Sequence, residues 1–293
     1  MDTEDLLRDL NEAQRRAVTS EAAPLCIVAG AGTGKTRVLT RRIAYRAAIG
    51  SADARHVLAL TFTRKAAGEL GARLRAFGLR DRISAGTFHA VAYAQLRQRW
   101  DDRGVSPPEL LERKGRLLGR RLPRRGASRP GGPPRVTVAD LAAEIEWAKA
   151  RIVPPSGYAV AASLAGRRPP NGVDEMERIY AGYEEDKRRL KLVDFDDLLD
   201  LCARAVEDDA DFAAAQRWRF RHLFVDEFQD VNPLQHRLLE AWRGASSDLC
   251  VVGDPNQAIY AWNGADPELL RKFHARHGGD VVELDVNYRS SPQ

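Results

Sequence analysis

A glycine-rich stretch, AGAGTGKT at positions 29–36, combines residue types that suit phosphate binding. Glycine lets successive backbone N–H groups turn toward one phosphate, a lysine ammonium adds positive charge, and a threonine hydroxyl can bind Mg²⁺. The generic pattern has glycine where this chain has Ala29, but the rest of the pattern keeps its spacing. We predict that this loop binds phosphate through Ala29, Gly30, Ala31, Gly32, Thr33, Gly34, Lys35 and Thr36.

Two adjacent acids, Asp226 and Glu227, follow the apolar run 223–225 in the stretch LFVDEFQD. Burying carboxylates at the end of a strand costs free energy unless a cation or hydrogen bonds compensate. In isolation, such a pair could simply mark a strand that enters an acidic loop. Beside a phosphate loop, however, Asp226 and Thr36 can hold Mg²⁺, and Glu227 can orient and deprotonate an attacking water.

The elements that would position these residues alternate between strand and helix. Helical sequence follows two of the apolar runs, at 35–48 and 64–77. Strand, helix and strand over this length form a βαβ unit, which implies a parallel sheet. The expected strands are 24–30, 56–62, 223–227, 249–254 and 281–285.

The middle of the chain has a different character. Residues 97–193 are mostly helical and charged, and GASRPGGPP at 126–134 indicates a loop. We therefore expect an α/β domain over 1–96 and 194–293 that is interrupted by a helical insertion. The insertion is rich in basic residues between positions 113 and 135, which could form a solvated segment or contact nucleic-acid phosphates.

Composition limits the class of protein. The chain has 293 residues, 44% of them hydrophobic, and a net charge of +5, which permits a polyanionic partner without requiring one. Cys26, Cys202 and Cys250 are too widely separated to indicate a disulfide framework or a cysteine zinc site. Because no signal peptide or membrane-spanning run is apparent, we expect a soluble protein of the cytoplasm.

Several further segments, in order, strongly resemble superfamily 1A DNA helicases of the UvrD/Rep/PcrA type. The resemblance implies a RecA-like P-loop NTPase fold, with the α/β part as domain 1A and the insertion as domain 1B. EIEWAKA at 144–150 is similar to an actinobacterial UvrD subgroup. The segments are LNEAQRRAV (10–18), LTFTRKAAGEL (60–70), SAGTFHAVAY (84–93), VDFDDLL (193–199), VDEFQD (225–230), VVGDPNQAIYAWNGAD (251–266) and NYRSS (287–291).

The resemblance assigns roles around ATP and Mg²⁺. Gln14 would bind adenine, with Arg37 and Tyr288 lying against the base. Gln257 would sense the γ-phosphate, and Arg289 would act as an arginine finger during phosphoryl transfer. Two residues between the nucleotide and the DNA, Gln229 and Asp230, would couple hydrolysis to DNA binding.

The same resemblance predicts a path for single-stranded DNA. Hydroxyl groups suit phosphates, and aromatic faces suit unstacked bases of any sequence. Phe62 and Phe88 could equally belong to the core, and His89 could be a polar helix residue with local partners. The predicted DNA contacts are Thr61, Phe62, Thr63, Thr87, Phe88, His89, Tyr260 and Trp262.

Two features depart from the family pattern. Asn263 follows Trp262 where relatives often have arginine, and the sequence stops at Gln293, where relatives continue into a second RecA-like domain. We therefore expect the N-terminal portion of an ATP-dependent 3′–5′ helicase or translocase that acts on single-stranded DNA and junctions in repair or replication. The alternatives are a nucleotide-gated single-strand-binding module with negligible turnover and the motor part of a RecB- or AdnB-like helicase–nuclease. A metabolic kinase would leave GTFHAVAY without a role.

Overall fold

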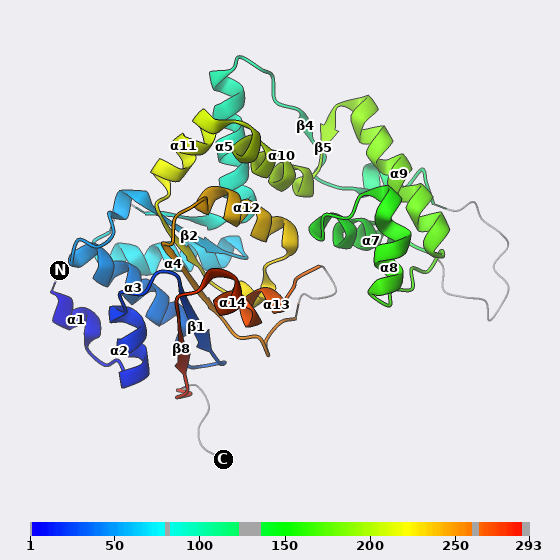
Figure 1. Cartoon of the computed structure of the whole chain (residues 1–293). Helices are drawn as coiled ribbons and strands as arrows, with labels where there is room; N and C mark the ends of the chain where they lie inside the picture. The colour runs from blue at the N-terminus through cyan, green and yellow to red at the C-terminus, as the bar shows by residue number, and fades with distance from the viewer. Residues whose placement is uncertain (1, 80–82, 123–135, 260–263, 289–293) are drawn as a thin grey trace.

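A six-stranded parallel sheet forms the centre of the molecule (Figure 1). The computed structural model describes residues 2–79, 83–122, 136–259 and 264–288. The strand order is β3-β2-β6-β7-β1-β8, which confirms the predicted α/β class. The strands are β1 Leu25–Ala29, β2 Val57–Thr61, β3 Ser84–Thr87, β6 His222–Val225, β7 Leu249–Gly253 and β8 Asp280–Leu284.

Helices cover both faces of this sheet, as a parallel sheet with apolar strands requires. One core lies between the sheet and α2, α3 and α4, and the other lies between the sheet and α5, α10 and α12. The helices are α1 Thr3–Leu7, α2 Glu12–Thr19, α3 Lys35–Ala48, α4 Arg64–Ala76, α5 Phe88–Asp102, α6 Gly115–Leu118, α7 Val138–Ala150, α8 Tyr158–Leu164, α9 Val173–Leu190, α10 Phe195–Asp208, α11 Ala210–Arg219, α12 Pro233–Arg243, α13 Glu268–Arg271 and α14 Phe273–His277.

Short polar side chains fix where several of these helices begin. Thr63, Thr87, Asp194 and Asn232 each accept a hydrogen bond from the backbone N–H three residues later. Such a cap satisfies a donor that would otherwise lack a partner in the first turn. The caps at Thr63 and Thr87 set α4 and α5 directly behind the ends of β2 and β3.

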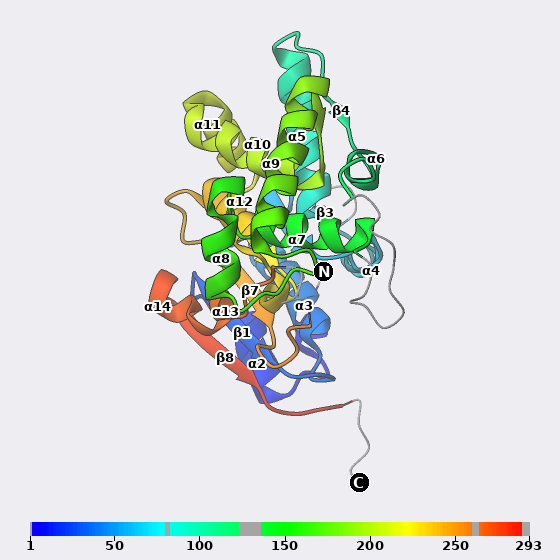
Figure 2. The same ribbon diagram turned by 90° about the vertical axis from the view of Figure 1, so that its right-hand side faces the viewer.

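A third core forms within the insertion. It gathers apolar side chains from α6, α7, α8 and α9, and Figures 1 and 2 show the last three helices grouped to one side of the sheet. Two short strands that the sequence did not indicate, β4 Glu109–Leu110 and β5 Leu192–Val193, pair in parallel beside this core. The boundaries of the insertion at 97 and 193 stay a prediction, since α5 continues without a break to Asp102.

Buried ion pairs join the insertion to the start of α10. The Lys149 ammonium lies 2.8 Å from Asp194, and the Lys114 ammonium lies 2.9 Å from Asp196. Burial alone would lower the pKa of Lys149, but the neighbouring carboxylates, first that of Asp194, raise it well above its usual value. Lys114, which lies near the start of the arginine-rich segment 113–135, is thus buried against acidic partners that are distant in sequence.

Candidate nucleotide and DNA site

The glycine-rich loop connects β1 to the N-terminus of α3, which directs backbone N–H groups and the positive end of the helix dipole at one point. Gly32 and Gly34 have φ angles of 77° and 93°, which side chains with a Cβ rarely adopt. A Cβ on Gly34 would also approach the Gln14 amide nitrogen to 3.1 Å. These two glycines are therefore required by the shape of the loop.

Ala29, the departure from the generic pattern, ends β1 and is fully buried. Its φ angle is not positive, so the position does not need glycine. The methyl group packs in the core on the α3 side of the sheet. The substitution is therefore accommodated before the loop begins to turn.

The metal end of the site pairs Thr36 with Asp226. The Thr36 hydroxyl donates to an Asp226 carboxylate oxygen at 3.3 Å, and the Glu227 N–H donates to the other oxygen at 3.1 Å. Asp226 is only 4% exposed, and burial, with a smaller effect of Glu227, raises its pKa to about 6. A buried carboxylate beside a hydroxyl, with no cation in direct contact among the described residues, fits the oxygen ligands of Mg²⁺.

The raised pKa gives a testable sign for the metal-free protein. Between about pH 4 and pH 6 folded Asp226 keeps a proton that the unfolded chain has released, so stability falls as the pH rises through this window. Asp226→Asn removes that cost. We expect the substitution to raise the melting temperature more near pH 8 than near pH 4. The corresponding difference in the free energy of unfolding is up to about 3 kcal/mol, because each pKa unit is worth about 1.4 kcal/mol.

Thermal unfolding of both proteins in EDTA at the two pH values would measure this difference. Asp230 has a similarly raised pKa of about 6, caused first by burial and then by Glu227, but it is present in both proteins and cancels in the comparison. A gain of the same size at both pH values would contradict the assignment of this titration to Asp226.

Glu227 and Lys35 meet beside the phosphate loop. The Lys35 ammonium lies 3.4 Å from a Glu227 carboxylate oxygen and donates to the Gln257 side-chain oxygen at 3.2 Å. Glu227 has a φ of 52°, a left-handed conformation that is uncommon for a residue with a Cβ. In this conformation the Glu227 carboxylate lies beside Lys35 of the phosphate loop, and the side chain is 36% exposed.

Gln229 connects this pair to neighbouring strand ends. Its side-chain N–H donates to Glu227 at 2.9 Å, and its side-chain oxygen accepts from the Asp254 N–H at 3.0 Å. Asp254 in turn accepts from the Gln257 amide. The residues predicted to sense the γ-phosphate and to activate water thus belong to one hydrogen-bonded chain.

The residues predicted to contact the base lie on the other side of the loop. Gln14 is 1% exposed; its amide donates to the Thr33 carbonyl at 2.8 Å and accepts from the Asn11 N–H. The Tyr288 hydroxyl accepts from Asn11 at 2.8 Å, and Arg37 donates to the Asp9 carbonyl. The amide of Gln14 therefore has a partner at each end within the chain.

Most of these residues surround one cavity of about 500 Å³. Arg73 from α4 also reaches it, although no motif in the sequence indicated this residue. Its position on a helix far from the loop in sequence explains why spacing could not reveal it. The lining residues are Gly30, Ala31, Gly32, Gly34, Lys35, Thr36, Arg37, Arg73, Glu227, Gln257 and Tyr288.

A second cavity, of about 360 Å³, brings together three residues predicted to contact DNA, namely Phe62, Thr63 and His89. Asp230 lines the same cavity, so the chain from Glu227 through Gln229 ends at its wall, where the Gln229 amide lies 3.5 Å from Asp230. Burial lowers the pKa of His89, which keeps its imidazole neutral near pH 7. Lys114 and Glu146, from the insertion, also line this cavity.

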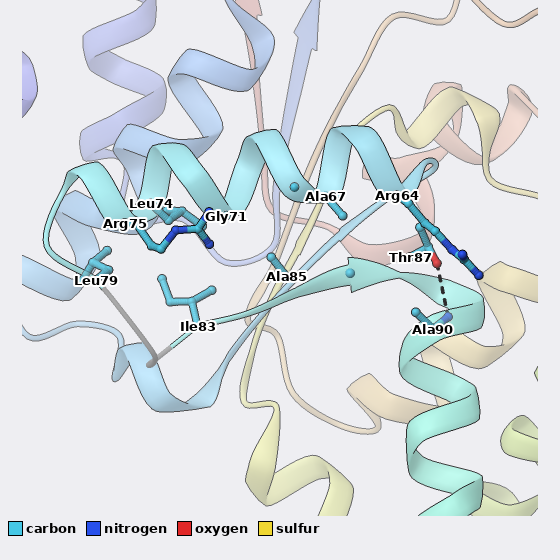
Figure 3. A pocket seen from close by; sticks show the side chains of 12 residues that line it. Arg64, Ala67, Gly71, Leu74, Arg75, Leu79, Ile83, Ala85, Thr87 and Ala90 are labelled. Carbon is cyan, nitrogen blue, oxygen red and sulfur yellow. Dashed lines mark hydrogen bonds between the residues drawn. The ribbon is translucent and has the colours of Figure 1, made fainter.

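Other predicted DNA contacts lie elsewhere. Phe88 is 1% exposed and stacks on Trp242 in the core, so it supports the fold instead of presenting a face to a base. Thr61 is also buried, and its hydroxyl has no partner among the described residues. Figure 3 shows Thr87 beside Arg64 at one end of a third cavity, between α4 and β3, of about 470 Å³. Tyr260, Trp262, Asn263 and Arg289 lie outside the described residues.

Comparisons with known proteins agree with this geometry. Residues 10–278 match the family described as UvrD/REP helicase N-terminal domain. ATP-dependent DNA helicase UvrD2 of Mycobacterium tuberculosis is 44% identical over 306 residues, covering 99% of this chain and 43% of that protein. DNA helicase II of Escherichia coli is 32% identical, covering 99% of this chain and 40% of that protein. The chain thus spans less than half the length of these relatives.

The parallel sheet, the phosphate loop and the acids at the end of β6 define a RecA-like P-loop nucleotide-binding domain. The chain belongs to the UvrD/REP helicase N-terminal domain family, which its match over residues 10–278 shows. Within the described residues, no helix has the length and apolar character needed to cross a membrane.

Proposed function

We propose that this chain is the nucleotide-binding and DNA-tracking portion of an ATP-dependent DNA helicase or translocase with 3′–5′ polarity. One observation carries the proposal: in one cavity Lys35 contacts both Gln257 and Glu227, and the Thr36–Asp226 pair lies beside them. Relatives named as ATP-dependent DNA helicases support the DNA substrate. The proposed setting is repair or replication at the nucleoid of a bacterial cell.

In this proposal the side chains divide the work of hydrolysis. Lys35 binds the β- and γ-phosphates, and Thr36 and Asp226 hold Mg²⁺, which when bound neutralises charge on the phosphate oxygens. Glu227 orients a water and accepts its proton. When phosphate replaces the Lys35–Gln257 contact, Gln257 is released to respond to the nucleotide, and the Asp254–Gln229 chain carries that response toward Asp230.

Single-stranded DNA is the proposed track, with single-strand/duplex junctions as the site of unwinding. The cavity that holds Phe62, Thr63 and His89 offers an aromatic face, a hydroxyl and a neutral imidazole. Such groups suit bases and phosphates without reading sequence. Because Asp230 lines this cavity and contacts Gln229, DNA and nucleotide would act on the same short chain of residues.

Steady-state MgATP hydrolysis with and without an unstructured single-stranded oligonucleotide tests this function. We expect the oligonucleotide to stimulate hydrolysis in the full-length protein, and the same oligonucleotide in duplex form to stimulate it less. A rate of MgATP hydrolysis that does not change when single-stranded DNA is added would contradict the proposal and favour a nucleotidase of another kind.

Trp262→Ala is expected to weaken binding of single-stranded DNA by about 1–3 kcal/mol, regardless of base sequence, if one base stacks on the indole. Fluorescence anisotropy with a labelled oligonucleotide measures the loss. Trp218→Ala is a matched control, because Trp218 is 66% exposed on α11 and contacts His56 and Arg221, away from both cavities. Equal losses in the two variants would remove Trp262 from the DNA path.

A further inference from the structure

Two histidines and a glutamate converge between α12 and α14, at a place that the proposed function does not use. His236 and Glu240 lie one turn apart on α12, and His277 ends α14. One ligand atom from each of the three side chains lies within 4.8 Å of those of the other two. His236 Nε2 and His277 Nε2 are each 4.0 Å from the same Glu240 oxygen.

These contacts are not satisfied by hydrogen bonding. A separation of 4.0 Å exceeds the usual N–H···O range, so neither imidazole donates to Glu240 at this distance. The His277 side chain is only 5% exposed, and its Nδ1 has no hydrogen-bond partner among the described residues. The nitrogen that faces Glu240 is Nε2 in each histidine, so both rings present a nitrogen to one carboxylate oxygen without bonding to it.

The surrounding residues hold all three groups in place. The His277 ring packs against Phe273 at 4.7 Å between ring centroids, and the His236 ring lies 6.4 Å from that of Phe228. Arg243 donates to the second Glu240 oxygen from Nη2 at 2.7 Å, and its Nε–H donates to both Glu240 oxygens at 3.2 Å.

We propose that His236, Glu240 and His277 form a site for a divalent transition-metal ion of the Zn²⁺ type. Two imidazoles and a carboxylate are a common zinc ligand set, with a fourth position open to water. Ligand bonds of about 2.0–2.1 Å in a tetrahedron place neighbouring ligand atoms about 3.3 Å apart, so closing the observed 4.0 Å requires a shift of about 0.7 Å. Arg243 would remain bound to the second carboxylate oxygen as an outer partner.

A cluster of three acids elsewhere in the chain differs from the histidine cluster in its cation partners. Glu184, Asp194 and Asp197 also lie close enough to share an ion. There, however, the ammonium groups of Lys149 and Lys187 contact the carboxylates, at 2.8 Å from Asp194 and 2.6 Å from Asp197. Lysine ammonium groups thus contact two carboxylates of that cluster. In the histidine cluster Arg243 bonds to Glu240, and among the described residues no hydrogen bond or ion pair joins a cation to either imidazole.

A metal ion at the proposed site would join α14 to α12. α12 begins just after Asp230, and α14 packs through Phe273 against Phe228, the neighbour of Glu227. The segment between β7 and β8, which carries Gln257, would thereby be anchored at its distal end. The ion is expected to be structural: it should raise the melting temperature with concentration because it binds only the folded chain.

Equilibrium dialysis of the full chain against Zn²⁺, in excess Mg²⁺ to fill the nucleotide site, tests the proposal. We expect one Zn²⁺ per chain and, with Co²⁺ as the probe, visible absorption bands of a tetrahedral complex. His277→Ala should weaken Zn²⁺ binding by more than about 100-fold, since even outer-sphere losses weaken metal binding about 10–100-fold. His274→Ala is the matched control, because His274 is exposed on the same helix and bonds to the Gly279 carbonyl.

Glu240→Gln provides a second variant that keeps the shape of the side chain. Circular dichroism in EDTA, and MgATP binding in Zn²⁺-free buffer without EDTA, would establish that each variant is folded. Loss of Zn²⁺ in folded His277→Ala or Glu240→Gln but not in His274→Ala supports the site. Stoichiometric Zn²⁺ that persists in both folded variants, or the absence of Zn²⁺ binding by the parent chain at micromolar concentrations, overturns it.

Discussion

Lys35→Ala is expected to abolish tight binding of MgATP while the fold remains intact. The Lys35 ammonium is 10% exposed and contacts only polar groups of the cavity, Glu227 and Gln257, so its removal leaves the hydrophobic core unchanged. A charged hydrogen bond to phosphate contributes about 1.5–3 kcal/mol. The affinity should therefore fall at least about 10- to 100-fold, which titration with a fluorescent ATP analogue would measure.

Lys272→Ala is the appropriate control for this variant. Lys272 is exposed and pairs with Glu268 at 3.1 Å, so its removal changes the net charge by the same amount without touching the loop. Unfolding curves for both variants should superimpose on that of the parent chain within about 0.5 kcal/mol. Unchanged nucleotide affinity in Lys35→Ala would disprove the assignment of 29–36 as the phosphate loop.

Glu227→Gln is expected to keep MgATP binding and to lose hydrolysis. Glutamine preserves the size of the side chain and can still contact Gln229, but it cannot accept a proton from water. General-base catalysis contributes about 10²–10⁴-fold, so the hydrolysis rate of the full-length protein should fall by that factor, or about 3–5 kcal/mol in activation free energy. Rapid-quench measurement of a single turnover would separate this loss from slower product release.

Glu283→Gln provides a matched control, because Glu283 is exposed on β8 and its substitution removes the same charge. The bound state of Glu227→Gln should accumulate intact ATP on the protein, which filter binding followed by chromatography can detect. Hydrolysis by Glu227→Gln at the parental rate would mean that another residue activates water.

Continuous apolar runs predicted most of the central sheet because its inner strands are buried on both faces. β1, β2 and β7 are continuous apolar runs, and predicted site residues lie at or just after their carboxyl ends. Because the strands are parallel, these ends lie along the same side of the sheet. β3 could not be recognised in this way. Its sequence, SAGT, contains small residues that are only partly buried at the edge of the sheet, so it carries no apolar signal.

Motif spacing indicated the phosphate loop and the pair of acids because, within each motif, residues that are adjacent in sequence are also adjacent in space. Arg73 reaches the nucleotide cavity through the packing of α4 beside α3, which no local pattern encodes. Phe88 illustrates the opposite limit: its motif indicates a DNA contact, but the tertiary position of α5 turns its ring into the core against Trp242. Lys114 likewise finds its acids only through folding of the insertion.

The parallel pairing of β4 with β5 has a consequence for how this architecture can vary. β4, Glu109–Leu110, lies in the first part of the predicted insertion and β5, Leu192–Val193, lies at its end, and these two stretches lie side by side. The described helices between them, α6, α7, α8 and α9, form a core of their own, and the described residues of this segment add no strand to the central sheet. The intervening segment could therefore be exchanged during evolution as a cassette, giving the same nucleotide-binding core a different accessory part without changing any strand pairing within it.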